Sequence, residues 1–381
     1  MSSGARILMF AGTLGLVPGA ACAAEWSVAP AFFLNADHQT NRTLSRGVPD
    51  SQSLGASLDV SLKRRTQSGE LEFAPHYFAR RISPKVEADV DDLNLPVRLN
   101  LGFERSSLSF GAQYADESTL TTELETTGVI YPDASRLLRA ADAGWRFAHA
   151  NARELNVSAS YSDVRYTGGY DQNYSDYDYG ALSVAETLTL SPRLALTFAG
   201  FGSHLHSEQR GSDNREAGIS VGFDYSWSEA TQMSATFGMS RRDFDGEHTQ
   251  GGTGSFNLSH CGETREWRLA LDQGLEPYSN GVLAERTTGQ FSMIQHFDPR
   301  LLAQMRVGLS RNEDVVVPTG VDARTYRYAD VELRWLAKET WSVSAICGYA
   351  DSQLPYAPER EEGWTVALRT GWSPSRHVLG H

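Results

Sequence analysis

Residues 219–227 read Ile-Ser-Val-Gly-Phe-Asp-Tyr-Ser-Trp, and they show most clearly the pattern on which the fold prediction rests. Large apolar residues occupy every odd position, while small or polar residues occupy every even one. Residues 233–240 repeat the pattern as Met-Ser-Ala-Thr-Phe-Gly-Met-Ser. A period of two predicts β-strands with one apolar and one polar face, because successive side chains of a strand point to opposite sides.

The same alternation recurs along the whole chain after residue 24. Eighteen segments show it, beginning near Trp26, Leu54, Leu71, Leu93, Leu108, Ala141, Leu155, Leu182, Leu194, Ile219, Met233, Phe256, Trp267, Phe291, Ala303, Ala329, Trp341 and Trp364. An even number suits a closed antiparallel barrel. The segments near Leu182, Phe256 and Phe291 are the weakest, so sixteen strands is the alternative to eighteen.

The connections between these segments alternate between short and long. Tight ones lie at 67–69, 105–106, 191–193, 228–230, 298–300 and 338–339. Longer polar ones lie at 83–91, 116–136, 167–178, 208–215, 245–252, 312–324 and 353–362. This sorting is typical of outer-membrane β-barrels, in which short turns are periplasmic and long loops extracellular. The prediction is an all-β fold: a single transmembrane antiparallel up-and-down barrel.

The tryptophans support a membrane setting. All eight fall on the apolar phase, and seven lie towards the short-turn ends: Trp26, Trp145, Trp227, Trp267, Trp335, Trp341 and Trp372, with Trp364 towards a long loop. Indole rings favour the boundary between membrane and water. We therefore predict that these eight are membrane-interface aromatics.

The N-terminus has the features of a cleaved signal peptide. Arg6 precedes a short apolar stretch, and Ala21-Cys22-Ala23 fits the A-x-A cleavage pattern. We expect a signal peptide at 1–23, a barrel at 24–372 and a short tail at 373–381. This organisation predicts export to the outer membrane of a Gram-negative bacterium. The net charge of −13 argues against nucleic acid as a partner, since a nucleic-acid-binding surface should be basic.

The polar phase of the strands should line a lumen. About eighteen strands leave a water-filled channel, and charged residues facing it can stay hydrated or paired. The pore-lining candidates are Asp59, Lys63, Arg65, Arg98, Glu104, Asp142, Arg146, Asp224, Arg268, Asp272, Arg306, Glu332, Arg334 and Arg369. Both signs are mixed, so no strong selectivity for one ion follows. No cofactor, metal-site or enzyme motif is present in the sequence.

The longest connection, Asp116 to Arg136, is a candidate constriction. It contains the apolar run Gly128-Val129-Ile130-Tyr131. Such a loop either folds inward and narrows the pore or caps the rim, and the sequence leaves both readings open.

Three short stretches resemble the porin-like barrels found with exopolysaccharide-biosynthesis operons, the EpsL-like group. They are Val28–Phe32, Asn41-Arg42, and the hairpin from Leu62–Thr66 to Glu70–Glu72. The resemblance implies passage or export of saccharide across the outer membrane, and polysaccharide-export components as partners. Lipid, lipopolysaccharide and the barrel assembly machinery are further expected partners. The alternative is a non-conducting surface protein whose loops bind glycan, lipopolysaccharide or a protein.

Overall fold

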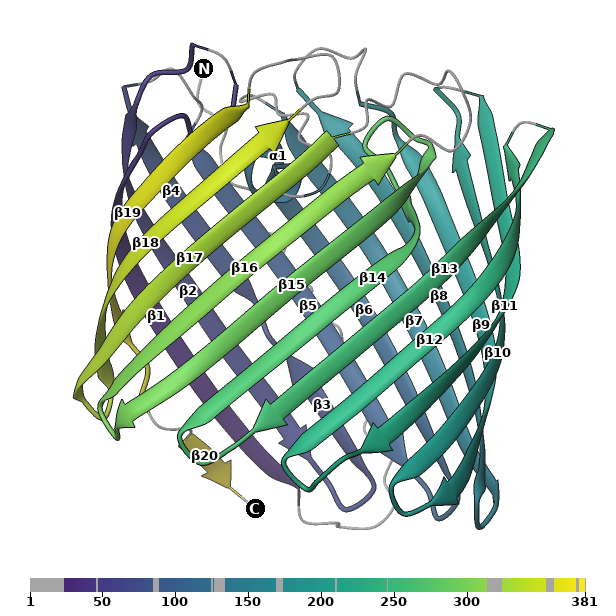
Figure 1. Ribbon diagram of the computed structural model, residues 1–381. Helices are drawn as coiled ribbons and strands as arrows, with labels where there is room; N and C mark the ends of the chain where they lie inside the picture. Colours follow the sequence, from purple (N-terminus) through teal and green to yellow (C-terminus); the bar gives the residue numbers. More distant parts are fainter. Residues whose placement is uncertain are drawn as a thin grey trace.

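The computed structural model describes residues 24–45, 47–84, 89–124, 126, 134–168, 174–209, 211–244, 246–313, 324–353, 360–374 and, as backbone only, 377–380. The predicted signal peptide and the Gly128–Tyr131 run lie outside these residues. Nearly all of the described chain is β-structure wound into one sheet (Figure 1).

The strands follow one another in chain order. They are β1 Glu25–Gln39, β2 Ser51–Arg65, β3 Gly69–Phe73, β4 His76–Ser83, β5 Val90–Gly102, β6 Ser106–Ser118, β7 Ser135–Ala150, β8 Arg153–Thr167, β9 Tyr177–Ser191, β10 Leu194–Ser207, β11 Ser212–Ser226, β12 Thr231–Phe244, β13 Glu247–Cys261, β14 Arg265–Pro277, β15 Leu283–Asp298, β16 Leu301–Glu313, β17 Arg324–Lys338, β18 Trp341–Gln353, β19 Glu361–Trp372 and β20 His377–Gly380. One helix, α1, spans Thr119–Thr122.

The barrel closes where β1 pairs with both β2 and β19. Between β2 and β5, β3 and β4 lie in line and together form one strand of the barrel. Pro75 interrupts that strand because proline has no N–H to donate, and its carbonyl accepts from the Val60 N–H instead. The barrel therefore has eighteen strands, as predicted, and the weak segments near Leu182, Phe256 and Phe291 are full strands β9, β13 and β15.

Two predicted long loops are mostly strand. β11 begins at Ser212 and β13 at Glu247, so little of 208–215 and 245–252 remains outside the sheet. Their polar composition is that of a loop because strands that extend beyond the membrane need no apolar face.

The outer surface of the barrel is apolar. Ile219, Phe237 and Met239 are 72%, 63% and 69% exposed, and they lie on the same phase as the tryptophans. A wall this apolar would be unstable in water, whereas a closed barrel leaves no unpaired edge in lipid. The barrel therefore spans a membrane. No helix among the described residues is long and apolar enough to do so.

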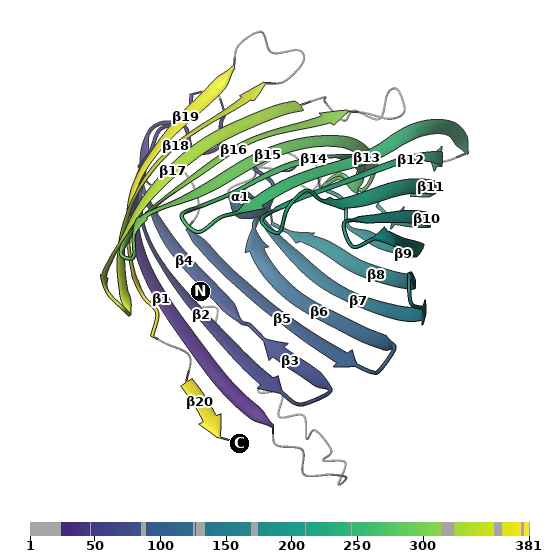
Figure 2. The ribbon, with the colours of Figure 1, turned by 60° about the horizontal axis from the view of Figure 1, so that its bottom comes forward.

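The predicted tail contributes a short strand. β19 ends opposite Phe32, so the first residues of β1 extend past it. β20 pairs with β1 there, between Trp26 and Val28. Figure 2 shows β20 beside the end of β1. The tail thus covers part of an edge that β19 leaves open.

Candidate functional site: the lumen and its constriction

The structure places thirteen of the fourteen pore-lining candidates on strands, on the phase opposite the tryptophans. They are Asp59, Lys63 and Arg65 on β2, Arg98 on β5, Asp142 and Arg146 on β7, Asp224 on β11, Arg268 and Asp272 on β14, Arg306 on β16, Glu332 and Arg334 on β17, and Arg369 on β19. Glu104 was predicted wrongly. It lies in the turn between β5 and β6, because β5 ends at Gly102.

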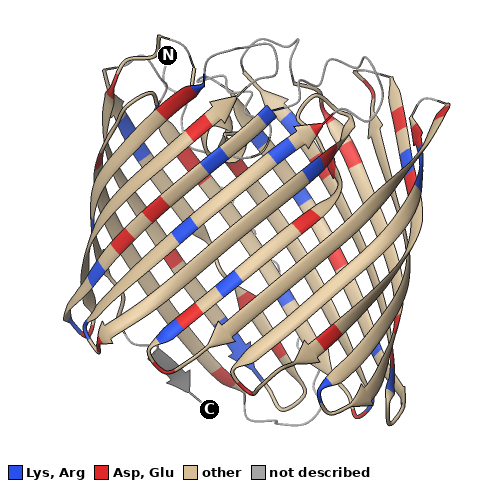
Figure 3. Cartoon of the chain, in the orientation of Figure 1, with Lys and Arg blue, Asp and Glu red and all other residues tan. Residues whose placement is uncertain are grey.

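Charges on the inner wall are joined in pairs. Lys63 Nζ lies 3.0 Å from Glu72 Oε1, and Arg306 Nη2 lies 2.9 Å from Asp330 Oδ1. Arg334 Nη2 lies 2.9 Å from Glu332 Oε1. Positive and negative residues are interleaved along β14 to β19 (Figure 3). The wall is therefore polar without a ring of one sign, in line with the mixed charges in the sequence.

The described part of the connection between β6 and β7, residues 119–124 and 126, folds into the barrel. Figures 1 and 2 show α1 inside the ring of strands near the long-loop end. Arg324 Nη1 donates to the Leu124 carbonyl at 2.9 Å, and Asn312 Nδ2 donates to the Thr126 carbonyl at 2.5 Å. Arg324 begins β17 and Asn312 lies near the end of β16.

These two hydrogen bonds join the loop to the wall opposite the strands from which it comes. Eight strands, β8 to β15, separate β7 from β16 in one direction. Six barrel strands separate β6 from β17 in the other. The described residues 119–124 and 126 therefore cross from one wall to the facing wall. Of the two readings of the Asp116–Arg136 loop, the structure supports the inward one.

Asp92 fixes the start of the crossing loop. Its carboxylate accepts from the Ser118 N–H at 2.7 Å and from the Thr121 hydroxyl at 2.8 Å. Ser118 caps α1 by accepting from the Leu120 N–H, and Leu120 packs on Ile82 and Val90. The sequence reading missed Asp92, although an acidic residue on the inward phase beside a long loop was a usable signal.

A second constriction is the hairpin tip between β14 and β15. Pairing of β13 with β14 stops at Gly254 opposite Gln273, yet β14 and β15 stay paired to Leu283. The tip consists of residues 278–282. The Ser279 carbonyl accepts from the Ser175 N–H at 2.9 Å, and the Gly281 carbonyl accepts from the Ser212 hydroxyl at 2.8 Å. The hairpin therefore separates from β13, although β15 stays paired with β16 up to Glu285, and its tip lies against the inner side of strands that are distant along the sheet.

An ion pair and an apolar cluster hold this hairpin inside. Arg242 on β12 lies 2.8 Å from Glu285 on β15, although β13 and β14 stand between these strands in the wall. Leu283 packs with four residues from the inward phase of other strands: Val164, Tyr177, Leu205 and Phe244. Each is an apolar residue on the polar phase near a loop, and this exception to the alternation is the sequence signal for an inward contact.

The predicted interface aromatics divide into two groups. Trp26, Trp145, Trp227, Trp335, Trp341 and Trp364 are exposed, while Trp267 and Trp372 are half-buried. Exposed tyrosines Tyr77, Tyr114 and Tyr161 share the outward phase towards the long-loop end and were not predicted. Among the residues that the structure describes, no group of three potential metal ligands occurs.

No model of a known protein family matches the chain, and no curated protein matches it. Solved structures do resemble it. OccAB4 of Acinetobacter baumannii is 11% identical with a TM-score of 0.50, covering 93% of this chain and 98% of that one. OpdK of Pseudomonas aeruginosa, solved with vanillate, is 12% identical with a TM-score of 0.48 over 92% and 99%. The siderophore receptor PirA of the same species is 10% identical with a TM-score of 0.45 over 91% and 80%. At such identities the likeness to OccAB4 concerns the fold alone, and it agrees with a complete β-barrel.

Proposed function

We propose that this protein is a bacterial outer-membrane channel that passes small polar solutes through a constricted lumen, and not an enzyme. The observation that carries the proposal is the crossing loop, held by Arg324 and Asn312 inside a barrel with a polar wall. An apolar exterior supports a place in a membrane, and the eighteen strands are enough for an aqueous interior. A loop fastened across such a lumen limits the size of what can pass.

Saccharide is the solute class that the wall favours. The ion pairs of β2, β16 and β17, and the mixture of both signs among the other charged residues of the wall, favour no single ion. Serine, asparagine and tyrosine side chains lie between them on the same phase, and such groups exchange hydrogen bonds with hydroxyls. The resemblance to exopolysaccharide-associated porins points to the same class. A polymer would have to pass the crossing loop, so its export would require that loop to move.

Single-channel conductance in planar bilayers tests the channel. The informative variant is Arg324→Met, which keeps an unbranched aliphatic stem but removes the guanidinium and with it the hydrogen bond to the Leu124 carbonyl. Its matched control is Arg268→Met, a lumen arginine that bonds Asn257 and does not contact the loop. We expect a steady conductance from the wild type and a larger one from Arg324→Met only. Folded barrels that never conduct, even as Arg324→Met, would overturn the proposal in favour of a surface-binding protein.

The solute class is tested in the same bilayers. A neutral oligosaccharide should interrupt the wild-type current in a concentration-dependent way, whereas an aromatic carboxylate at equal concentration should not. Blocking by the carboxylate alone would keep the channel but reject the saccharide.

A further inference from the structure

The outer surface of β9 to β12 carries a groove. Its upper part, of 880 Å³, includes Leu182, Val184 and Gly202, and its lower part, of 700 Å³, includes Ile219 and Met239. Gly200 lines both parts. A Cβ built on Gly200 would meet nothing within 4 Å, so the groove is open there. Glycines on the outward phase thus leave a continuous hollow between large apolar side chains.

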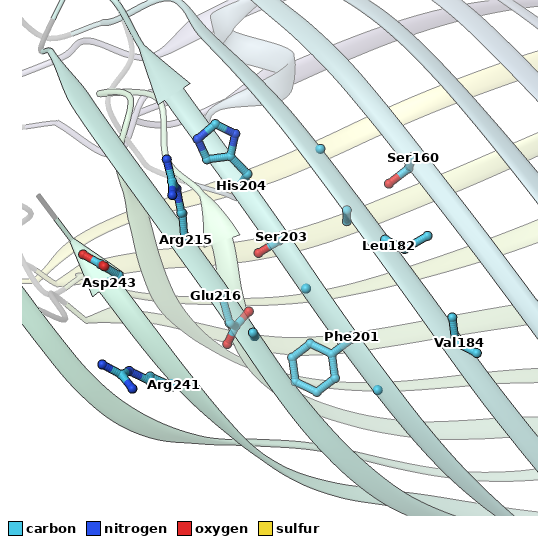
Figure 4. A pocket seen from close by; sticks show the side chains of 15 residues that line it. Ser160, Leu182, Val184, Phe201, Ser203, His204, Arg215, Glu216, Arg241 and Asp243 are labelled. Carbon is cyan, nitrogen blue, oxygen red and sulfur yellow. The ribbon is translucent and has the colours of Figure 1, made fainter. Parts of the chain in front are cut away.

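Charged side chains, among them two arginines, stand at the long-loop end of this groove. Figure 4 shows His204, Arg215, Arg241 and Asp243 on one side of the pocket, with Leu182 and Val184 on the other. Arg215 lies 3.0 Å from Asp213, which also pairs with His204. Arg241 is exposed and makes no ion pair with any described residue. Arg241 therefore lies beside an apolar hollow without an ion pair of its own in the described chain, and the Asp243 carboxylate at the same end pairs with His248 instead.

We propose that this groove binds lipid A, the phosphorylated, multiply acylated anchor of lipopolysaccharide, in the outer leaflet. Its phosphate would lie between Arg241 and Arg215, since guanidinium groups bind phosphate through paired hydrogen bonds. One acyl chain would lie over Gly202 and Gly200, against Leu182 and Ile219. Both halves of the ligand thus meet matching chemistry: an anion at the rim and a hydrocarbon chain below it.

A second copy of this chain fits the groove less well. Two copies related by a twofold axis would present the same face to each other, bringing arginines against arginines. A hollow lined by glycine also leaves a facing copy little to pack against. An anionic lipid neutralises Arg241 and fills the hollow at once, so charge and shape both favour it.

The proposal rests on the outer-membrane location in the proposed function but not on conduction. It is tested by titrating the purified, detergent-solubilised barrel with bisphosphorylated lipid A and counting bound lipids by native mass spectrometry. Arg241→Gln should weaken binding about tenfold, the loss expected for one charge-assisted contact. Gly200→Leu, which fills the groove, should weaken it similarly while conductance stays at the wild-type value.

Two matched controls make the result specific. Arg139→Gln removes an exposed outward arginine on β7 that lies outside the groove, and Gly289→Leu adds the same side chain to the outward phase of β15, opposite Leu271 and away from the groove. Both should bind lipid A like the wild type. Equal losses in Arg139→Gln and Arg241→Gln would overturn the proposal, as would unchanged binding in a folded Gly200→Leu. A groove occupied by a second copy, seen as a stable dimer that Gly200→Leu disrupts, would overturn it too.

Discussion

Glu285→Gln should release the β14–β15 hairpin from the inner wall. Arg242 is only 1% exposed, and its guanidinium lies 2.8 Å from Glu285 and 3.7 Å from Glu216, while donating to the Gly252 carbonyl at 3.3 Å. Removing one member of a buried ion pair typically destabilises by about 3–5 kcal/mol. Arg242 keeps Glu216, and the Glu285 side chain remains 24% exposed, so we expect about 2 kcal/mol here.

A loss of this size would move the hairpin equilibrium about thirtyfold towards the released form. The matched control is Glu276→Gln in the same hairpin, since Glu276 pairs with Arg286 at 2.8 Å but is 54% exposed. That exposed pair should contribute below about 1 kcal/mol. Urea unfolding in lipid vesicles, followed by tryptophan fluorescence, gives both free energies. Bilayer recordings of Glu285→Gln should show added excursions to higher conductance. If the two variants had equal stability and equal currents, the role given to the Arg242–Glu285 pair would be refuted.

Three further outcomes are expected. Gly281→Val should destabilise the hairpin tip by about 1–3 kcal/mol and raise the conductance. Gly281 has a φ of +77°, and an added Cβ would lie 2.6 Å from Ser207 Oγ. Unchanged currents would count against the tip as a constriction. Deleting residues 373–381 should lower the yield of folded barrel in vesicles, since β20 pairs with the start of β1; an unaffected yield would leave β20 without a role in closure. Trp341→Ala should reduce the free energy of unfolding in lipid by about 2 kcal/mol, whereas the same change should matter little if this ring is not at the membrane interface.

The wall of this barrel could be predicted from its sequence because a strand has a strict period of two. Ile219 and Met239 face outward for the same reason that they alternate with serine and glycine. Periodicity gives the face of each residue within a strand, so the lumen candidates other than Glu104 fell on the expected phase. Glu104 is the exception because β5 ends at Gly102, and the alternation has no structural meaning beyond the end of the strand.

The constriction could not be predicted in the same way. Leu124 and its partner Arg324 are 200 residues apart, and no local pattern records which wall an inward loop will reach. The inward fold of the β14–β15 hairpin is hidden because Leu283 and Glu285 stand on the phase that elsewhere faces lipid. Their true neighbours become apparent only from the structure, in which the hairpin lies against the inner side of β8 to β12.

The departure of β14 from β13 also limits how thick a bilayer this barrel can tolerate. Above Gly254, the described β13 residues 247–253 have no partner on β14. Hydrocarbon cannot satisfy free N–H and C=O groups, so the lipid tails must end at or below Gly254 on this side. The paired stretch Gly254–Cys261, at ~3.4 Å per residue and a tilt of ~40°, spans only about 20 Å of membrane, against ~25 Å for a usual apolar band. The barrel should therefore thin the outer membrane beside β13 and β14. Short-chain lipids should be enriched on that side of the barrel.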